Sequence, residues 1–210
     1  MELICFDMDN TLVYAQKLHV RAFHEAFKTC NLQKRKTRDI LKVLSLEGSI
    51  LVKILYPKLS KNEIKKVVDE HDRFVVKNAK HYITRIPGAV PMLQKLKRRY
   101  KLALLSNAKK KEIVATLQAA KISPKLFDII IGNDAVKHPK PAPDEMFKAQ
   151  KLLHIQKGYM VGDATYDIRA GKQAGLKTIA VCTGHHTKKE LQKEKPYKIL
   201  KSVAELSKVL

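Results

Sequence analysis

The chain opens on a short apolar run that ends in two aspartates. Residues 3–6 read LICF, and Asp7-Met8-Asp9 follows directly. The run has no helical period, which is typical of a strand buried on both faces of a parallel sheet. In an extended chain, Asp7 and Asp9 point the same way, just past the carboxyl end of the strand. Two anions this close require a cation, a proton or hydrogen-bond donors, so the pair indicates a metal site or a reaction centre.

A plain turn is the alternative interpretation of the same residues. The segment 7–11 reads DMDNT, which is rich in turn-forming residues, and an Asp or Asn here could cap a following helix. The segment alone does not separate the two interpretations, so the rest of the chain has to decide.

Length and composition predict a folded protein of one domain with an insertion, or of two small domains. The chain has 210 residues, of which 45% are hydrophobic. No apolar run approaches the ~20 residues of a membrane span, and Met1-Glu2 leads straight into the strand without room for a signal peptide. Cys5, Cys30 and Cys182 lack CxxC spacing and indicate buried thiols, with neither a disulfide nor a zinc site. We expect a cytoplasmic protein with no membrane partner.

The strong positive charge of the chain could indicate a nucleic-acid partner. Lysine and arginine number 42 against 20 aspartates and glutamates, a net charge of +22. The excess is spread along the chain, with 17 basic and 7 acidic residues in 14–86 and 25 and 13 in the remainder. Aromatic residues make up only 6%, so platforms for stacking bases are scarce. We therefore expect general basicity and no nucleic-acid partner.

Apolar spacing between Tyr14 and Ile86 predicts helices only. They are expected over residues 17–30, 36–43, 49–56 and 61–80. After Pro87-Gly88 the pattern changes to strands that alternate with helices. Further strands are expected over residues 101–105, 127–131, 159–161 and 178–181, and helices over 90–99, 110–120, 143–153, 168–174 and 202–209.

This alternation predicts an α/β fold with a Rossmann-like parallel sheet that carries helices on both faces. The helical stretch is then a second domain inserted after the first strand. We place the core domain at residues 1–13 and 87–210 and the helical cap domain at 14–86.

Polar residues stand where each of these strands ends. Ser106-Asn107 follows the second strand, and Gly162-Asp163 follows the fourth, with Asp167 one helical turn further on. Lys140 stands in a proline-rich run just before the helix that follows the third strand, and the prolines stiffen the backbone around it. Ligands of open parallel sheets bind beyond the carboxyl ends of strands. Independent turns do not readily explain so many polar groups at one edge.

The same residues resemble the four motifs of the haloacid dehalogenase-like (HAD) superfamily. These are Asp7-x-Asp9-Asn10-Thr11, Ser106, Lys140 in a Lys-Pro-x-Pro setting, and Gly162-Asp163-x-x-x-Asp167. They occur in the family's order, and the similarity covers nearly the whole chain. The helical stretch resembles the family's C1 cap, so the chain looks like a phosphoglycolate phosphatase or a β-phosphoglucomutase.

The resemblance implies roles for the two aspartates of the first motif. Asp7 would be the nucleophile that forms an aspartyl-phosphate. Asp9 would protonate the leaving oxygen and then deprotonate the water that releases phosphate. Haloacid dehalogenases themselves lack the second acid, so Asp9 favours phosphoryl chemistry over carbon–halogen chemistry.

The resemblance also implies a bound magnesium ion. Mg²⁺ would be held by the Asp7 carboxylate, the Asp9 backbone carbonyl and Asp163. Asp167 would orient Asp163 or a metal-bound water from outside the coordination sphere. Thr11 would support the first loop through its hydroxyl group.

Three further residues would bind the phosphoryl group. Ser106 and the backbone N–H of Asn107 would donate to a non-bridging oxygen, and Lys140 would pair with the phosphate and with Asp7. The plain alternatives are an N-cap for Ser106 and a solvated charge for Lys140.

Specificity is harder to predict from the cap. His19 matches the position of a cap histidine in β-phosphoglucomutases and several related phosphatases, but the polar edge of a helix is the simpler interpretation. Tyr14 stands where many family members have an Asp, which weakens any transfer of their specificity. We assign no role to the other histidines considered, His24, His71, His81, His185 and His186.

The expected function is therefore that of a Mg²⁺-dependent phosphatase for small phosphomonoesters, such as phosphoglycolate or a sugar phosphate. One alternative is a phosphomutase, which would return the phosphoryl group to a bound sugar. Another is a nucleic-acid- or protein-binding module on an inactive HAD scaffold. We expect a monomer or a homodimer.

Overall fold

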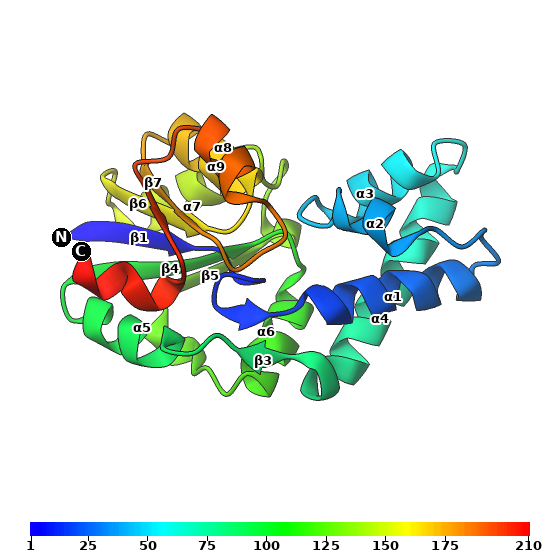
Figure 1. The fold of residues 1–210 in the computed structure, drawn as a ribbon, viewed down its shortest axis with the longest axis horizontal. Coiled ribbons are helices and arrows are strands. Elements are labelled where there is room, and N and C mark those ends of the chain that lie inside the picture. Colours follow the sequence, from blue (N-terminus) through cyan, green and yellow to red (C-terminus); the bar gives the residue numbers. More distant parts are fainter.

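Six parallel strands form the central sheet in the order β5-β4-β1-β6-β7-β8, in a computed structural model that describes residues 1–210 (Figure 1). The strands are β1 (Glu2–Phe6), β4 (Tyr100–Ser106), β5 (Ile129–Gly132), β6 (Gly158–Gly162), β7 (Lys177–Val181) and β8 (Lys198–Leu200). The chain runs outward from β1 through β4 to β5, then returns to β6 on the other side of β1. This reversal places the switch point of the sheet at β1, where ligands of such sheets bind.

Helices cover both faces of the sheet. One face packs against α5 (Ala89–Lys97), α6 (Lys110–Ala119) and the 3₁₀ helix η3 (Val203–Lys208), and the other against α7 (Asp144–Leu153) and α8 (Thr165–Gln173). Ile4 and Phe6 of β1 belong to the first core and Leu3 and Cys5 to the second, so β1 is buried on both faces as its sequence predicts. Three short elements complete this part: η1 (Pro124–Leu126), η2 (Asn133–Ala135) and α9 (Lys188–Lys193).

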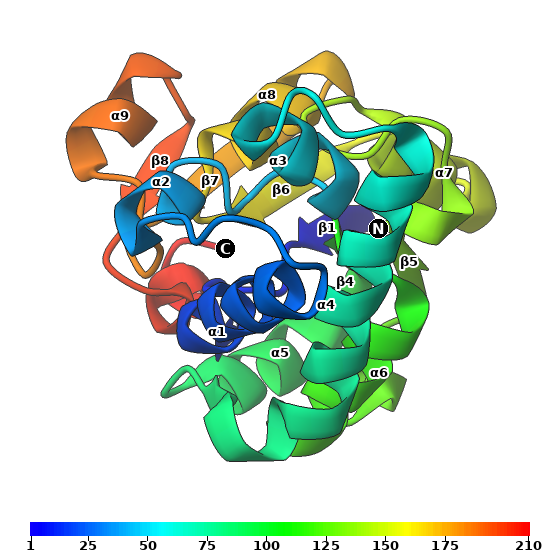
Figure 2. The same ribbon diagram turned by 90° about the vertical axis from the view of Figure 1, so that its right-hand side faces the viewer.

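Four helices form an insertion after β1 that lies beyond the carboxyl end of that strand (Figures 1 and 2). They are α1 (Gln16–Thr29), α2 (Thr37–Leu41), α3 (Gly48–Leu55) and α4 (Lys61–Tyr82). They share a separate apolar core that includes Phe23, Phe27 and Leu51. Ser60 and Glu63 form a capping box at the start of α4. The predicted sheet and helical insertion are confirmed.

A two-stranded antiparallel ribbon marks the ends of this insertion. β2 (Val13–Tyr14) pairs with β3 (Thr84–Arg85), and the domain boundaries that we propose fall beside them. The sequence predicts no strand at residues 84–85, and this is wrong. Both residues of β3 are exposed, so the apolar alternation that indicates a strand is absent there.

The last part of the chain also differs from its prediction. The helix expected over residues 202–209 is a 3₁₀ helix, η3, and the short elements α9 and β8 are not predicted. Cys5 is buried as expected, whereas Cys30 and Cys182 are partly exposed, and all three are free thiols. No helix is both long enough and apolar enough to cross a membrane.

Candidate active site

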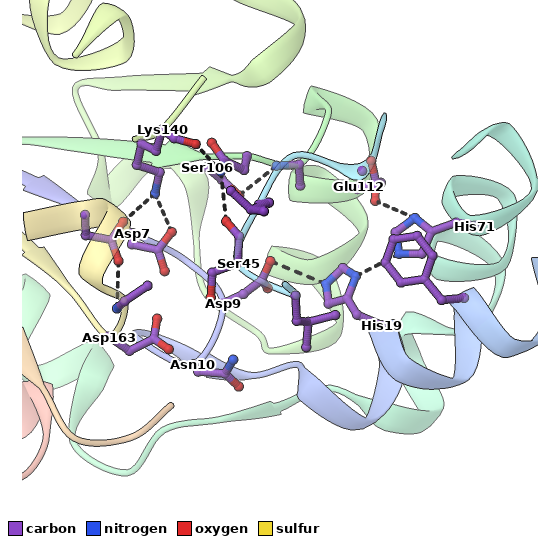
Figure 3. A pocket seen from close by; sticks show the side chains of 18 residues that line it. Asp7, Asp9, Asn10, His19, Ser45, His71, Ser106, Glu112, Lys140 and Asp163 are labelled. Atoms are coloured by element: carbon purple, nitrogen blue, oxygen red, sulfur yellow. Dashed lines mark hydrogen bonds and ion pairs between the residues drawn. The ribbon is translucent and has the colours of Figure 1, made fainter. Parts of the chain in front are cut away.

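A cavity of about 80 Å³ lies between the carboxyl ends of β1, β4 and β6 and the helical insertion (Figure 3). The sheet side contributes the predicted residues Asp7, Asp9, Ser106, Asn107, Lys140, Asp163 and Asp167. The insertion contributes His19, Phe23, Ser45 and His71, among others. Residues that are far apart in the sequence thus meet in one enclosed site, as the strand ends predict.

The extended backbone at the end of β1 aims both aspartates at this cavity. The Asp7 N–H donates to the carbonyl of Val161 at 2.9 Å, which continues the sheet by one residue. Met8 is fully buried between the two acids, so Asp7 and Asp9 share the opposite side of the chain. The Asn10 side chain then accepts from the N–H groups of Ala15 and Gln16, which turns the chain into α1.

Lys140 is buried beneath Asp7, with only 2% of its surface exposed. Its Nζ donates to Asp7 Oδ1 at 2.6 Å, to Asp167 Oδ1 at 2.9 Å and to the Leu105 carbonyl at 3.2 Å. Burial acts to lower the pKa of Lys140, but Asp167 and Asp7 offset this and hold the pKa well above its usual range. The alternative of a solvated loop charge is therefore wrong.

Three buried carboxylates surround this single ammonium group. The oxygens of Asp7, Asp163 and Asp167 lie within 4.8 Å of one another. Burial, together with Asp167 and Asp9, raises the pKa of Asp7 to about 7, although Lys140 acts in the opposite direction. Burial and the neighbouring Asp7 and Asp167 also raise the pKa of Asp163 well above its usual range. This excess of negative charge favours a bound cation.

The hydrogen bonds indicate which of these carboxylates could bind a metal. Both oxygens of Asp167 are occupied, one by Lys140 and one by the Ala164 N–H at 3.0 Å. Asp163 Oδ1 accepts from the Thr11 hydroxyl at 3.4 Å, whereas Asp163 Oδ2 is buried without a hydrogen-bond partner. The donor set that remains consists of hard oxygens on Asp7 and Asp163, which suits Mg²⁺.

Ser106 and Asn107 lie at the end of β4, which is the neighbour of β1 on the side away from β6. Ser106 Oγ accepts from the Ala108 N–H at 3.2 Å, and the N-cap residue of α6 is Lys109, so the alternative that Ser106 is an N-cap is wrong. The Asn107 side chain donates to the carbonyls of Ser45 and Lys140, both at 2.9 Å. The first of these bonds connects the sheet edge to the insertion.

Residues 4–181 match the family described as haloacid dehalogenase-like hydrolase. The chain belongs to this family. Over 212 residues it is 26% identical to the pyrophosphatase PpaX of Bacillus cereus, covering 99% of this chain and 95% of PpaX. The predicted HAD family is confirmed, and the chain is an enzyme of the hydrolase class.

Solved structures share the whole fold of this HAD hydrolase. A hydrolase from Pseudomonas syringae superposes with a TM-score of 0.89 at 21% identity, over 99% of this chain and 97% of that one. CbbY from Rhodobacter sphaeroides superposes with a TM-score of 0.83 at 26% identity, over 98% and 96%. The helical insertion is therefore a C1-type cap.

A second group at the cavity consists of His19 and His71 from the cap and Glu112 from α6 of the core. His19 Nε2 lies 3.4 Å from Asp9 Oδ2, so His19 reaches the acid pair and is more than the polar edge of a helix. His71 and Glu112 lie next to it, although we assigned neither a role. They come from helices that are distant in the sequence, and no spacing motif connects them.

A buried glutamate below the HAD site makes stability depend on pH. Glu145 in α7 is fully buried, and burial raises its pKa to about 7. Since an unfolded glutamate titrates near ~4.3, the folded state holds the proton more tightly, and this contribution to stability is lost as pH rises towards 7. At each pH, the free energy of unfolding of Glu145→Gln is compared with that of the wild type. We expect the advantage of the variant to be about 1–3 kcal/mol larger at pH 8 than at pH 5. Urea denaturation at both pH values tests this, and an equal effect at the two would contradict it.

Proposed function

We propose that this HAD hydrolase is a Mg²⁺-dependent phosphatase that hydrolyses small phosphomonoesters through phosphorylation of Asp7. The single observation that carries the proposal is the environment of that carboxylate. Asp7 shares one cavity with Asp9, Ser106 and Lys140, and Lys140 Nζ lies 2.6 Å from its Oδ1. A nucleophile, an acid and two phosphate-binding groups thus surround the same small volume.

Each residue has a defined part in the proposed reaction. A carboxylate oxygen of Asp7 attacks phosphorus, while the bond from phosphorus to the leaving oxygen breaks. Asp9 gives its proton to that oxygen and later takes one from the water that attacks the phosphorylated Asp7. Ser106 and the Asn107 N–H bind a non-bridging oxygen, and the Lys140 ammonium stabilises the charge that develops there.

Asp7, Asp163 and the Asp9 backbone carbonyl are the proposed magnesium ligands. The buried and unpartnered Asp163 Oδ2 supports this assignment. When bound, Mg²⁺ offsets the repulsion between an anionic nucleophile and an anionic phosphate. Thr11 supports the site by donating a hydrogen bond to Asp163, and Asp167 supports it by accepting one from Lys140.

The small cavity favours compact substrates. Its volume of about 80 Å³ is well below the ~300–1,000 Å³ of pockets that hold drug-sized ligands. Phosphoglycolate and short sugar phosphates are the first candidates. The related CbbY has been crystallised with phosphate and, as a mutant, with xylulose-(1,5)bisphosphate, which supports a sugar phosphate.

Pyrophosphate is a second candidate, which the similarity to PpaX favours. Its second phosphate would need additional positive charge. Lys140 is the only lysine or arginine that lines the cavity, and the remaining basic groups are His19 and His71. Phosphomonoesters therefore remain the first proposal.

A substrate panel tests the proposed function. Purified protein is assayed for phosphate release from phosphoglycolate, sugar monophosphates, p-nitrophenyl phosphate and pyrophosphate, with Mg²⁺ and with EDTA. We expect release from at least one monoester without added bisphosphate, and its loss with EDTA. Absence of release from every ester would contradict a phosphatase, and a requirement for a sugar bisphosphate would indicate a phosphomutase.

Replacing Asp9 should separate proton transfer from attack. We expect Asp9→Asn to lower kcat by about 10²–10⁴-fold for alkyl phosphates, because the leaving alkoxide then departs without a proton. The first release of p-nitrophenol from p-nitrophenyl phosphate should fall much less, because this leaving group needs no proton, although the later hydrolysis of phosphorylated Asp7 still lacks its base. Rapid-mixing kinetics of the phosphorylation step on both ester types measure this, and full activity of the variant on alkyl esters would refute the assigned role.

A further inference from the structure

Two histidines of the cap face each other at the wall of the cavity (Figure 3). His19 Nδ1 in α1 lies 3.1 Å from His71 Nε2 in α4. Glu112 in α6 of the core completes the group, and one ligand atom from each of the three residues lies within 4.8 Å of the others. All three side chains line the cavity, and His71 and Glu112 are only 6% and 3% exposed.

The outer nitrogen of each histidine faces a carboxylate. His19 Nε2 lies 3.4 Å from Asp9 Oδ2, and His71 Nδ1 lies 3.1 Å from Asp72 Oδ1. An ionised carboxylate can only accept, so the favoured arrangement places the proton of each ring on this outer nitrogen. A neutral imidazole carries a single N–H. The two inner nitrogens, His19 Nδ1 and His71 Nε2, then direct lone pairs towards each other.

Two lone pairs that face each other at this distance call for a cation between them. In a tetrahedral zinc site, two nitrogen ligands are about 3.3 Å apart, which is close to the 3.1 Å between the two inner nitrogens. Histidines that bind a metal usually donate their other N–H to a carboxylate or a carbonyl group. Both rings show this pattern, so the hydrogen bonds around the pair are those of metal ligands.

Glu112 provides a third ligand and unbalanced negative charge. Its Oε1 accepts from the Lys109 N–H at 3.1 Å, and its Oε2 lies 3.9 Å from His71 Nδ1, too far for a hydrogen bond. No lysine or arginine forms an ion pair with Glu112 or with Asp9. Burial, together with the neighbouring Asp72, raises the pKa of Glu112 to about 7. A dication bound to this carboxylate would offset the charge, which a proton shared by the two histidines does only in part.

We propose that His19, His71 and Glu112 form a second metal site, which binds a first-row transition-metal dication such as Zn²⁺. Two imidazoles and one carboxylate suit such an ion, whereas the hard oxygens around Asp7 suit Mg²⁺. The site contains no cysteine, so the spacing of the cysteines gives no signal for it.

The position of this site defines what a bound ion could do. Three protein ligands at the wall of a cavity leave a fourth position for water or for an anionic oxygen of a ligand in the cavity. His19 and His71 belong to the cap and Glu112 to the core, so the ion would also join the two domains beside Asp9.

Calorimetric titration of the whole protein with Zn²⁺, in excess Mg²⁺, tests the proposal. We expect the wild type to bind one Zn²⁺ at this site. His19→Gln and Glu112→Gln should each weaken that binding at least ~10-fold, because losing a ligand costs more than losing the hydrogen-bond partner of a ligand. The amide of Glu112→Gln can still accept from the Lys109 N–H, so the start of α6 is kept. His24→Gln is the matched control, because His24 lies on the same helix as His19 but outside the cavity, and it should bind Zn²⁺ like the wild type.

A further variant and one spectrum identify where the zinc binds. Asp163→Asn should keep the zinc, and the absorption spectrum at the zinc edge should show two imidazole nitrogens at ~2.0–2.1 Å. Zinc that is lost in Asp163→Asn but kept in His19→Gln would occupy the proposed magnesium site and would overturn the inference. A wild type that binds no Zn²⁺, or equal affinity in all the variants, would overturn it as well. No readout uses a substrate, so the result does not depend on the proposed phosphatase function.

Discussion

Asp7→Asn is expected to abolish turnover and leave the fold intact, with phosphate release reduced by about 10⁴-fold or more. The amide keeps the shape of the carboxylate and can still accept from Lys140, but it cannot form the proposed phosphoryl bond. It also removes one of three buried carboxylates, and the pKa of this carboxylate is raised by burial and by the neighbouring Asp167 and Asp9. We therefore expect the melting temperature of the metal-free variant to be equal to or above that of the wild type.

Phosphate release and thermal unfolding in EDTA measure these two effects. Asp144→Asn is a suitable control, because Asp144 is an aspartate at the surface, bonded to His138 and outside the cavity. It should keep the wild-type rate. More than about one hundredth of the wild-type activity in Asp7→Asn would rule out this residue as the nucleophile.

The sequence was sufficient to predict the sheet and the position of the site for a physical reason. Strands such as β1 are buried on both faces, and their continuous apolar runs stop where the backbone leaves the sheet. The residues just past these stops, such as Asp7 and Asp163, can then be placed at one edge without knowing the strand order. Their convergence follows from the parallel direction of the strands alone.

Elements that owe their form to tertiary contacts were not predictable in this way. β3 consists of two exposed residues, which form a strand only because they pair with β2. His71 acquires its surroundings from His19 and Asp72, and the first of these pairs joins residues 52 positions apart. A single sequence carries no periodic signal for such a contact.

The bonds of Asp167 were likewise beyond prediction. The resemblance implies that this side chain orients Asp163 or a metal-bound water, and in the structure it accepts from Lys140 and from the Ala164 N–H at the start of its own helix. The family motif specifies that an acid stands at this position. Only the three-dimensional arrangement specifies which partner it meets.

Lys140→Met should cost both activity and stability, because it leaves three buried carboxylates without their only ammonium partner. We expect kcat to fall by about 10³-fold, since the charge developing on the phosphoryl group loses its stabilising cation. Without Lys140 the folded-state pKa of Asp7 rises further above its unfolded value near ~3.9. Protonation of Asp7 stabilises the folded variant at low pH, and this stabilisation is lost as pH rises. The free energy of unfolding of the variant should therefore be lowest at alkaline pH.

Urea denaturation in EDTA tests the stability part of this prediction. At pH 8.5 we expect Lys140→Met to lower the free energy of unfolding by about 3–5 kcal/mol, as for other broken buried ion pairs, and by clearly less at pH 5.5, where protons replace the missing cation. Lys137→Met, an exposed residue of the same loop, should change neither value. A loss independent of pH would mean that Lys140 supports the fold through packing of its aliphatic chain, and that its charge does not balance the acids around it.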